Sequence, residues 1–132
     1  MTRDEIFARV RTVVAAAVNI DEHRVQGSSV IIADLDAESI DFLDIVFRLE
    51  REFQIKIPRG ELFPEQIGHT DFVSHGKVTL QGLAYMRERM PYADLTDFER
   101  EPSISQIGDI FTVDLVCQYI MWKLAQPRKQ PF

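Results

Sequence analysis

The chain has 132 residues, a formal net charge of −6 and a single cysteine, Cys117. This length suits one domain with a sizeable core, and one cysteine excludes an internal disulfide framework. The negative charge argues against nucleic acid or an anionic membrane as the main partner, because both would repel the protein. Residues 1–20 show no signal-peptide pattern, and no stretch has the roughly 20 apolar residues of a membrane span. We expect a soluble cytoplasmic protein without membrane insertion.

A first helix is predicted over residues 3–18. The stretch "TRDE" after Met1 has the pattern of a capping box, and apolar residues then recur at helical spacing. These residues are Ile6, Val10, Val13, Val14, Ala17 and Val18. Residues 19–37 are predicted to form a loop that packs over the helices, because a lone strand there would have no pairing partner. The apolar residues of this loop are Val30, Ile31, Ile32 and Leu35.

A second helix is predicted from Ser39 to Phe53, before "IKIP", where Pro58 prevents its continuation. Spacing residues at about 100° places its large apolar side chains in two stripes, separated by roughly 135°. The core stripe consists of Phe42, Ile45, Val46, Leu49 and Phe53. The second stripe consists of Ile40, Leu43 and Phe47. A helix with two apolar faces needs two packing partners.

This helix also lies in the most acidic part of the chain. The segment 34–53 contains seven acids and two arginines, which gives a local charge of −5. Ser39 stands at the start of the helix, where a helix cap is its default role. No histidine lies near it in sequence to act as a base, so a hydrolytic role is not supported.

Residues 59–102 form a long segment before the last helix. Here "ELFPEQIGH" predicts a turn or two of helix broken by Pro64 and Gly68, and "TLQGLAYMRERMP" predicts a short helix capped by Thr79 and stopped at Pro91. The segment has too many apolar residues for a solvated loop, so we expect it to fold onto the helices. These residues are Leu62, Phe63, Ile67, Phe72, Val78, Leu80, Leu83, Tyr85 and Met86.

The last helix is predicted over "TVDLVCQYIMWKLA", with Thr112 as its cap, and residues 126–132 are predicted to be a loose tail. The helix directs inward Val113, Val116, Tyr119, Ile120 and Leu124. No period-2 pattern favours a strand, so the fold class is all-α.

The remaining reactive residues match no chemical motif. His69, Asp71 and His75 lack the spacing of a recognised metal-ligand set, so we interpret them as polar loop residues. Lys77 after a glycine lacks the second glycine and the preceding strand of a phosphate-binding loop. Cys117 is interpreted as a small core residue. We expect no metal site and no catalytic residue.

The stretch "DLDAESIDFLDIVFRLEREFQIKIP" resembles the modification segment of acyl carrier proteins, in which an Asp-Ser-Leu triplet opens an acidic, apolar helix. It is most similar to the long, specialised carriers that hold very long acyl chains for lipid A, through "DFLDIVF", "IKIP" and a "GKV" element. The similarity covers residues 1–58 and the final helix. Glu38 stands in place of the usual aspartate and Ile40 in place of leucine. Ordinary carriers have a short link and a small third helix, expected here over 103–108.

The resemblance implies a bundle over residues 1–125 with an insertion at 59–102, and a flexible tail at 126–132. It makes Ser39 the attachment point of 4′-phosphopantetheine. It also implies a partner surface that steers the basic patches of client enzymes. This surface consists of Glu38, Ile40, Asp41, Leu43, Asp44 and Phe47.

The function implied is that of a monomeric acyl carrier in a specialised fatty-acid or lipid pathway, including one that handles long chains. Such a protein is no enzyme but a substrate of a phosphopantetheinyl transferase. Its further partners are ketosynthases, acyl-activating enzymes or acyltransferases. Two alternatives remain open, which are a carrier for polyketide or peptide synthesis and an unmodified helical interaction module.

Overall fold

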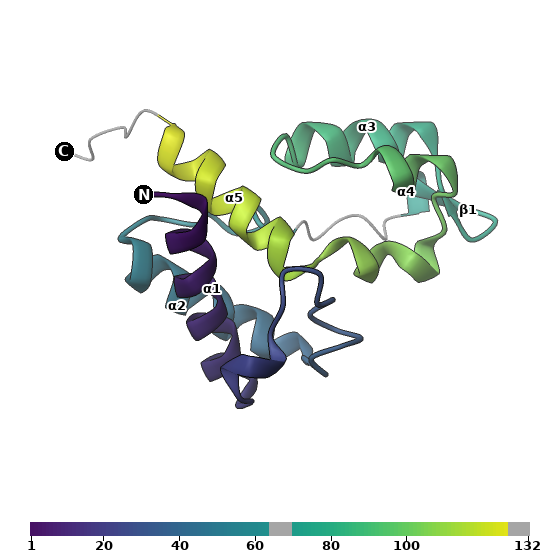
Figure 1. Ribbon diagram of the computed structural model, residues 1–132. Helices are drawn as coiled ribbons and strands as arrows, with labels where there is room; N and C mark the ends of the chain where they lie inside the picture. The colour runs from purple at the N-terminus through teal and green to yellow at the C-terminus, as the bar shows by residue number, and fades with distance from the viewer. Residues whose placement is uncertain (64–69, 127–132) are drawn as a thin grey trace.

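The computed structural model describes residues 1–63 and 70–126 of the chain. Helices α1 (Arg3–Val18), α2 (Ser39–Phe53) and α5 (Val113–Ala125) form a bundle, with α1 packed against both of the others (Figure 1). The three predicted main helices are therefore confirmed.

Two of the predicted helix caps form as expected. The hydroxyl oxygen of Thr2 accepts a hydrogen bond from the Glu5 amide at 3.2 Å, and that of Thr112 accepts one from the Leu115 amide at 3.1 Å. Each bond pairs an amide of the first turn that has no partner inside its own helix. Helix α1 ends at Asn19, whose φ of 58° places it in the left-handed conformation common at helix ends.

The bundle buries most of the apolar positions that the periodicity assigns to its interior. The others are half-buried, and they are Ala17, Val18, Phe42, Val46 and Leu124. The large buried side chains come from all three helices and are Ile6, Val10, Val14, Ile45, Leu49, Val116, Tyr119 and Ile120. Their removal from water is the main source of the bundle's stability. Within residues 1–63 and 70–126, no helix is long and apolar enough to cross a lipid bilayer.

The connection between α1 and α2 packs over the bundle, as predicted. It also contains a short 3₁₀ turn, η1 (Glu22–Arg24), where only a loop was predicted. The Ile31 amide donates to the Phe111 carbonyl and the Val113 amide donates to the Ser29 carbonyl, each at 3.0 Å. This connection therefore fixes the start of α5.

A small hairpin follows the bundle's second helix. Strands β1 (Val73–Ser74) and β2 (Lys77–Val78) pair antiparallel. The turn between them places His75 at a φ of 53° and Gly76 at 76°, the two positive angles that a tight hairpin turn requires. The prediction that the chain has no strands is therefore wrong here, because two-residue strands are too short to show an alternating pattern.

Helix α3 (Leu80–Arg89) begins at its predicted cap, Thr79, and ends before Pro91. It is preceded by the 3₁₀ turn η2 (Thr70–Phe72). The helix predicted in "ELFPEQIGH" falls largely on residues 64–69, which lie outside the described residues.

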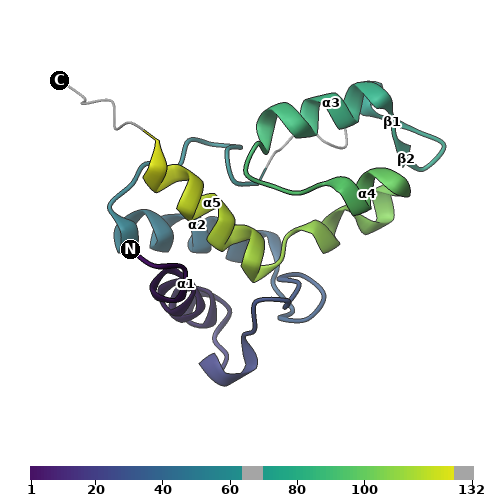
Figure 2. The ribbon, with the colours of Figure 1, turned by 45° about the horizontal axis from the view of Figure 1, so that its top comes forward.

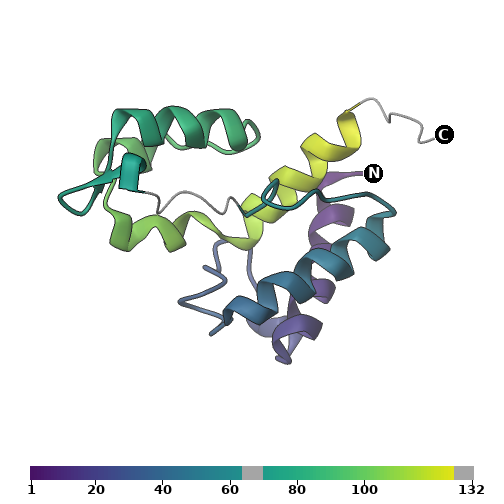
Figure 3. The same cartoon turned by 180° about the vertical axis from the view of Figure 1, so that it is seen from behind.

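Two further helical segments complete the chain. Helix α4 (Thr96–Arg100) was not predicted, and its N-cap Leu95 is not a residue type that favours caps. The small helix expected over 103–108 is present as a 3₁₀ segment, η3 (Ile104–Ile110). In Figures 2 and 3, α3, α4 and the hairpin form a group of their own beside the bundle.

This second group has its own apolar interior. We call Val78, Leu83, Met86 and Leu95 the outer cluster. We call Met90, Phe111 and Leu115 the joining cluster, because Leu115 belongs to α5. Leu80 is 84% exposed, so the expectation that it packs inward is wrong, and Ile67 lies outside the described residues. Residues 70–102 thus pack largely on one another, and the segment 59–102 meets the bundle both at the joining cluster and through Leu62, Phe63 and Tyr92, which pack in or against the bundle core.

Candidate functional site at the start of helix α2

The chain turns sharply just before α2. Asp36 has a φ of 57°, and the buried Ala37 then donates its amide to the Ile31 carbonyl at 3.2 Å. Glu38 is the N-cap and Ser39 is the first residue of the helix, so the interpretation of Ser39 as the cap is wrong. The side chain of Ser39 lies outside the described part of the structure.

An acidic side chain fixes this helix start. The Glu38 amide donates to Oδ2 of Asp41 at 2.7 Å, and the Asp41 amide donates to the Glu38 carbonyl at 2.9 Å. Asp44 pairs with Arg48 at 3.0 Å, one turn further on. Two of the three acids of the expected partner surface therefore also have a local structural role. The surface ion pair between Asp44 and Arg48 contributes little stability, whereas the Asp41 carboxylate satisfies a backbone amide at the helix start.

The second apolar stripe of α2 is exposed to solvent. Ile40 is 69% exposed, Leu43 61% and Phe47 58%, whereas Ile45 and Leu49 on the core stripe are fully buried. The predicted division of the helix into two apolar faces is confirmed. Large apolar side chains gathered on one exposed face are typical of interaction and ligand sites.

A groove of about 780 Å³ runs between α2 and residues 57–63. We call it the α2 groove. Its helix side consists of Phe42, Leu43, Val46, Phe47 and Glu50. These residues follow position 39 by three, four, seven, eight and eleven residues, so they lie on the side of the helix that position 39 faces. The groove therefore starts within about one turn of Ser39 and follows the same face.

The opposite wall of the groove is held by the last helix. Oε1 of Glu61 accepts from the Tyr119 hydroxyl at 2.5 Å and from Lys123 Nζ at 2.6 Å. The Tyr92 hydroxyl lies 3.0 Å from the carbonyl oxygens of both Glu61 and Leu62. Burial raises the pKa of Tyr119, and its hydrogen bond to Glu61 raises it further. This network was not predicted, since its members lie up to 62 residues apart in sequence.

Residues 8–67 match the family described as the phosphopantetheine attachment site. The acyl carrier protein of Thermotoga maritima is 34% identical over 61 residues, covering 46% of this chain and 75% of that relative. The acyl carrier protein AcpXL of Rhizobium meliloti is 37% identical over 75 residues, covering 57% of this chain and 72% of that relative. No solved structure matches the chain significantly.

The chain belongs to the acyl carrier protein family. The resemblance noted from "DFLDIVF" and "IKIP" is confirmed, and 4′-phosphopantetheine is the prosthetic group of this carrier. Acyl carrier proteins hold acyl groups as thioesters on the thiol of this group, so the reactive atom belongs to the prosthetic group and not to the polypeptide. The α2 groove fits this chemistry, because its lining is mostly apolar and begins close to the start of α2.

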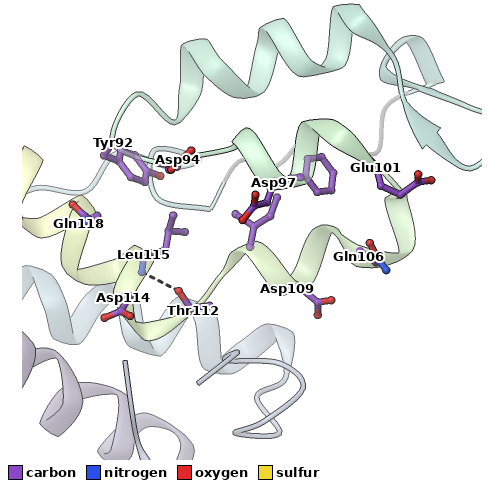
Figure 4. Close-up of a pocket in the computed structure, with 13 residues that line it drawn as sticks. Tyr92, Asp94, Asp97, Glu101, Gln106, Asp109, Thr112, Asp114, Leu115 and Gln118 are labelled. Carbon is purple, nitrogen blue, oxygen red and sulfur yellow. Dashed lines mark hydrogen bonds between the residues drawn. The ribbon is translucent and has the colours of Figure 1, made fainter. Parts of the chain in front are cut away.

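The carrier has a second cleft, of about 510 Å³, between α4 and the first half of α5 (Figure 4). Five carboxylates line it, which are those of Asp94, Asp97, Glu101, Asp109 and Asp114. Asp114 pairs with Arg3 at 3.0 Å and Glu101 pairs with Lys77 at 3.1 Å. An acyl chain in this cleft would strip water from charged groups, which is costly. The α2 groove is therefore the better candidate for acyl binding.

The other reactive residues of the carrier form no metal site within 1–63 and 70–126. In these ranges no group of three or more His, Cys, Asp or Glu side chains is placed to hold a metal ion, and His69 lies outside them. Cys117 is fully buried in the bundle, and this burial raises the pKa of its thiol. It is a core residue, as predicted.

Proposed function

We propose that Ser39 carries the 4′-phosphopantetheine arm and that the α2 groove shelters the acyl chain attached to it. One observation supports this proposal above the others. The groove residues Phe42, Leu43, Val46 and Phe47 occupy the helix face of position 39 and begin three residues after it. An arm attached at position 39 can therefore turn back along α2 and place an acyl chain against apolar side chains.

The helix start also suits the phosphodiester of the arm. Backbone N–H groups and the helix dipole favour a negative group at a helix N-terminus. Asp36, Glu38 and Asp41 oppose it by charge repulsion, but the Asp41 carboxylate already accepts a hydrogen bond from the Glu38 amide at 2.7 Å. The role of the polypeptide is to hold the phosphodiester at this position and to exclude water from the acyl chain.

The exposed stripe and the acids beside it form the proposed partner surface. Ile40, Leu43 and Phe47 supply apolar contacts, and Glu38 and Asp44 supply negative charge around them. Basic patches on the phosphopantetheinyl transferase, ketosynthases, acyl-activating enzymes or acyltransferases complement this surface. Charge complementarity of this kind gives fast, salt-sensitive and transient association.

We further propose a specialised fatty-acid or lipid pathway with long acyl chains as the setting. The similarity to AcpXL and the insertion at 59–102 support this choice. The proposed carrier domain is 1–125, and a monomeric, cytoplasmic protein remains our prediction.

Intact mass measurement tests the proposal. Incubation with a phosphopantetheinyl transferase and coenzyme A should add one phosphopantetheine to the protein and none to Ser39→Ala. Ser28→Ala is the matched control, because Ser28 is an exposed serine of the preceding loop and should leave modification intact. Modification of Ser39→Ala would refute the assignment, and an unmodified wild-type protein would favour the plain interaction module. If enzymes of polyketide or peptide synthesis load the carrier and fatty-acyl enzymes do not, the proposed fatty-acid or lipid pathway is wrong.

A further inference from the structure

Phe63 occupies the boundary between the α2 groove and the joining cluster. Its ring meets the ring of Phe42 edge-on, with centroids 4.6 Å apart, and Phe42 and Phe63 both line the groove. The same ring meets Phe111 at 5.4 Å, and Phe111 belongs to the joining cluster. Phe63 is only half-buried, so part of its surface faces open space.

The far side of this ring is apolar. Met90, Phe111 and Leu115 are buried there, with Ala93 and Ile110 packed against them. The Tyr92 hydroxyl lies nearby, but it already donates hydrogen bonds to the Glu61 and Leu62 carbonyls. Ala93, Ile110 and Leu115 also line the acidic cleft between α4 and α5, whereas Met90 and Phe111 do not. An acyl chain that passed the Phe63 ring and ended at Met90 would therefore lie in an apolar environment.

The rest of the wall is held more firmly than the Phe63 ring. Glu61 is tied to α5 by Tyr119 and Lys123, and Leu62 is fully buried. A phenyl ring can change rotamer without a backbone shift, and the thioether chain of Met90 adapts readily to a new neighbour. The movable part of the boundary is therefore the Phe63 side chain itself.

We propose that Phe63 is the residue that determines acyl-chain length in this carrier, acting as a gate between the α2 groove and the joining cluster. This inference rests on the proposed function, in which the acyl chain lies in the groove. Short chains end at the closed ring and contact only the groove. Longer chains turn the ring aside and reach Met90.

Methyl NMR of the acylated protein tests the gate. The protein is loaded with saturated acyl groups of increasing length, and the ¹³C-methyl signals of Met90 and Val46 are followed. In the wild type, Val46 should shift with every chain, whereas Met90 should shift only above a threshold length. Met86 is the internal control. It is buried in the outer cluster, which includes neither Phe63 nor Phe111, and its signal should move less than that of Met90 at every chain length.

Variants at position 63 should move this threshold. Phe63→Ala and the milder Phe63→Leu should lower the chain length at which Met90 responds, and Phe63→Trp should raise it. Phe72→Ala removes a ring that stacks on Tyr85 at 4.7 Å, away from the groove, and should leave the threshold unchanged. A Met90 signal that never moves, or that moves at one length in all variants, overturns the gate. If Val46 also stays still at every length, the groove assignment fails instead.

Discussion

The hydroxyl of Tyr119 donates a 2.5 Å hydrogen bond to Oε1 of Glu61, which ties the last helix to the segment that follows α2. Tyr119 is fully buried, and Lys123 approaches the same carboxylate oxygen at 2.6 Å. The Glu61 carboxylate is half-buried and has two donors, so losing one donor leaves part of its desolvation cost uncompensated. The position of the groove wall thus depends on α5.

Tyr119→Phe should lower the free energy of unfolding by about 1–3 kcal/mol, because the Glu61 carboxylate loses its shortest hydrogen bond while the ring is kept. Urea denaturation of the unmodified protein measures this change. Tyr85→Phe is the control, since the Tyr85 ring stacks on Phe72 far from Glu61, and it should cost less. Equal costs for the two variants would contradict a structural role for the Glu61 bond.

The free energy of unfolding should fall at high pH because of Tyr119 and Tyr92. Burial raises the pKa of Tyr119 and of Tyr92 in the folded protein, and the unfolded value is about 10. Below that pH both the folded and the unfolded protein keep the phenol protons, so the two tyrosines contribute fully to the free energy of unfolding. Above it the unfolded state releases the proton first, so the free energy of unfolding drops by up to about 1.4 kcal/mol per pH unit for each tyrosine. Urea titrations from neutral to alkaline pH should show a shallower decline for Tyr119→Phe, and parallel curves would argue against this linkage.

The two faces of α2 should separate stability from partner recognition. Leu49→Ala removes a fully buried side chain and should cost about 2–5 kcal/mol. Phe47→Ala removes a side chain that is 58% exposed, so it should cost well under that amount while it weakens acyl transfer to client enzymes. Denaturant midpoints and transfer rates decide the matter. An equally destabilising Phe47→Ala would mean that α2 has one broad core face and no partner stripe.

The start of α2 should depend on Asp41 rather than on Ser39. Asp41→Ala removes the acceptor of the Glu38 amide and should cost about 1 kcal/mol, a typical value for a lost cap. Ser39→Ala should leave the thermal unfolding midpoint nearly unchanged, because Ser39 is not the N-cap. Asp44→Ala is the charge-matched control for Asp41→Ala. Its carboxylate pairs with Arg48 at the surface and does not cap the helix, so a loss as large as that of Asp41→Ala would remove the capping explanation.

Gly82 in α3 should not tolerate a methyl group. A Cβ atom there would lie 2.6 Å from Val78 Cγ1 and 2.7 Å from the Phe72 carbonyl oxygen. Replacing glycine by alanine inside a helix normally stabilises by up to about 1 kcal/mol, but overpacking of this kind costs about 1–3 kcal/mol and should dominate. Hydrogen exchange should therefore speed up in α3 and the hairpin of Gly82→Ala and stay unchanged in α1. Gln81→Ala, at an exposed neighbouring position, should not show this effect.

The bundle could be predicted from the sequence because its signals are local. Thr2, Thr79 and Thr112 each stand within three residues of the amide that they cap, and apolar residues recur every three or four positions. The exposed stripe of α2 followed from the same periodicity, since no single core could cover both faces of the helix. The resemblance then linked this helix to phosphopantetheine.

The remaining features depend on contacts between distant residues or on very short elements. Glu61 meets Tyr119 across 58 residues, and no sequence pattern pairs them. The hairpin has two residues per strand, so alternation cannot be seen in it. Serine is a common N-cap and glutamate is not, so the sequence favoured Ser39 for this role, whereas the N-cap is Glu38. The groove wall at 57–63 is likewise visible only once the chain is folded.

The contact between Phe63 and Phe111 means that the chain leaves the bundle and returns to it at neighbouring points. When both ends of a connection are fixed side by side, doubling its length costs only about 0.6 kcal/mol of closure entropy. Residues can therefore be added between these two phenylalanines at little cost, provided that Tyr92 keeps its hydrogen bonds to the Glu61 and Leu62 carbonyls. The length of this connection can therefore vary while the start of α2, where we propose that the prosthetic group is attached, keeps its structure.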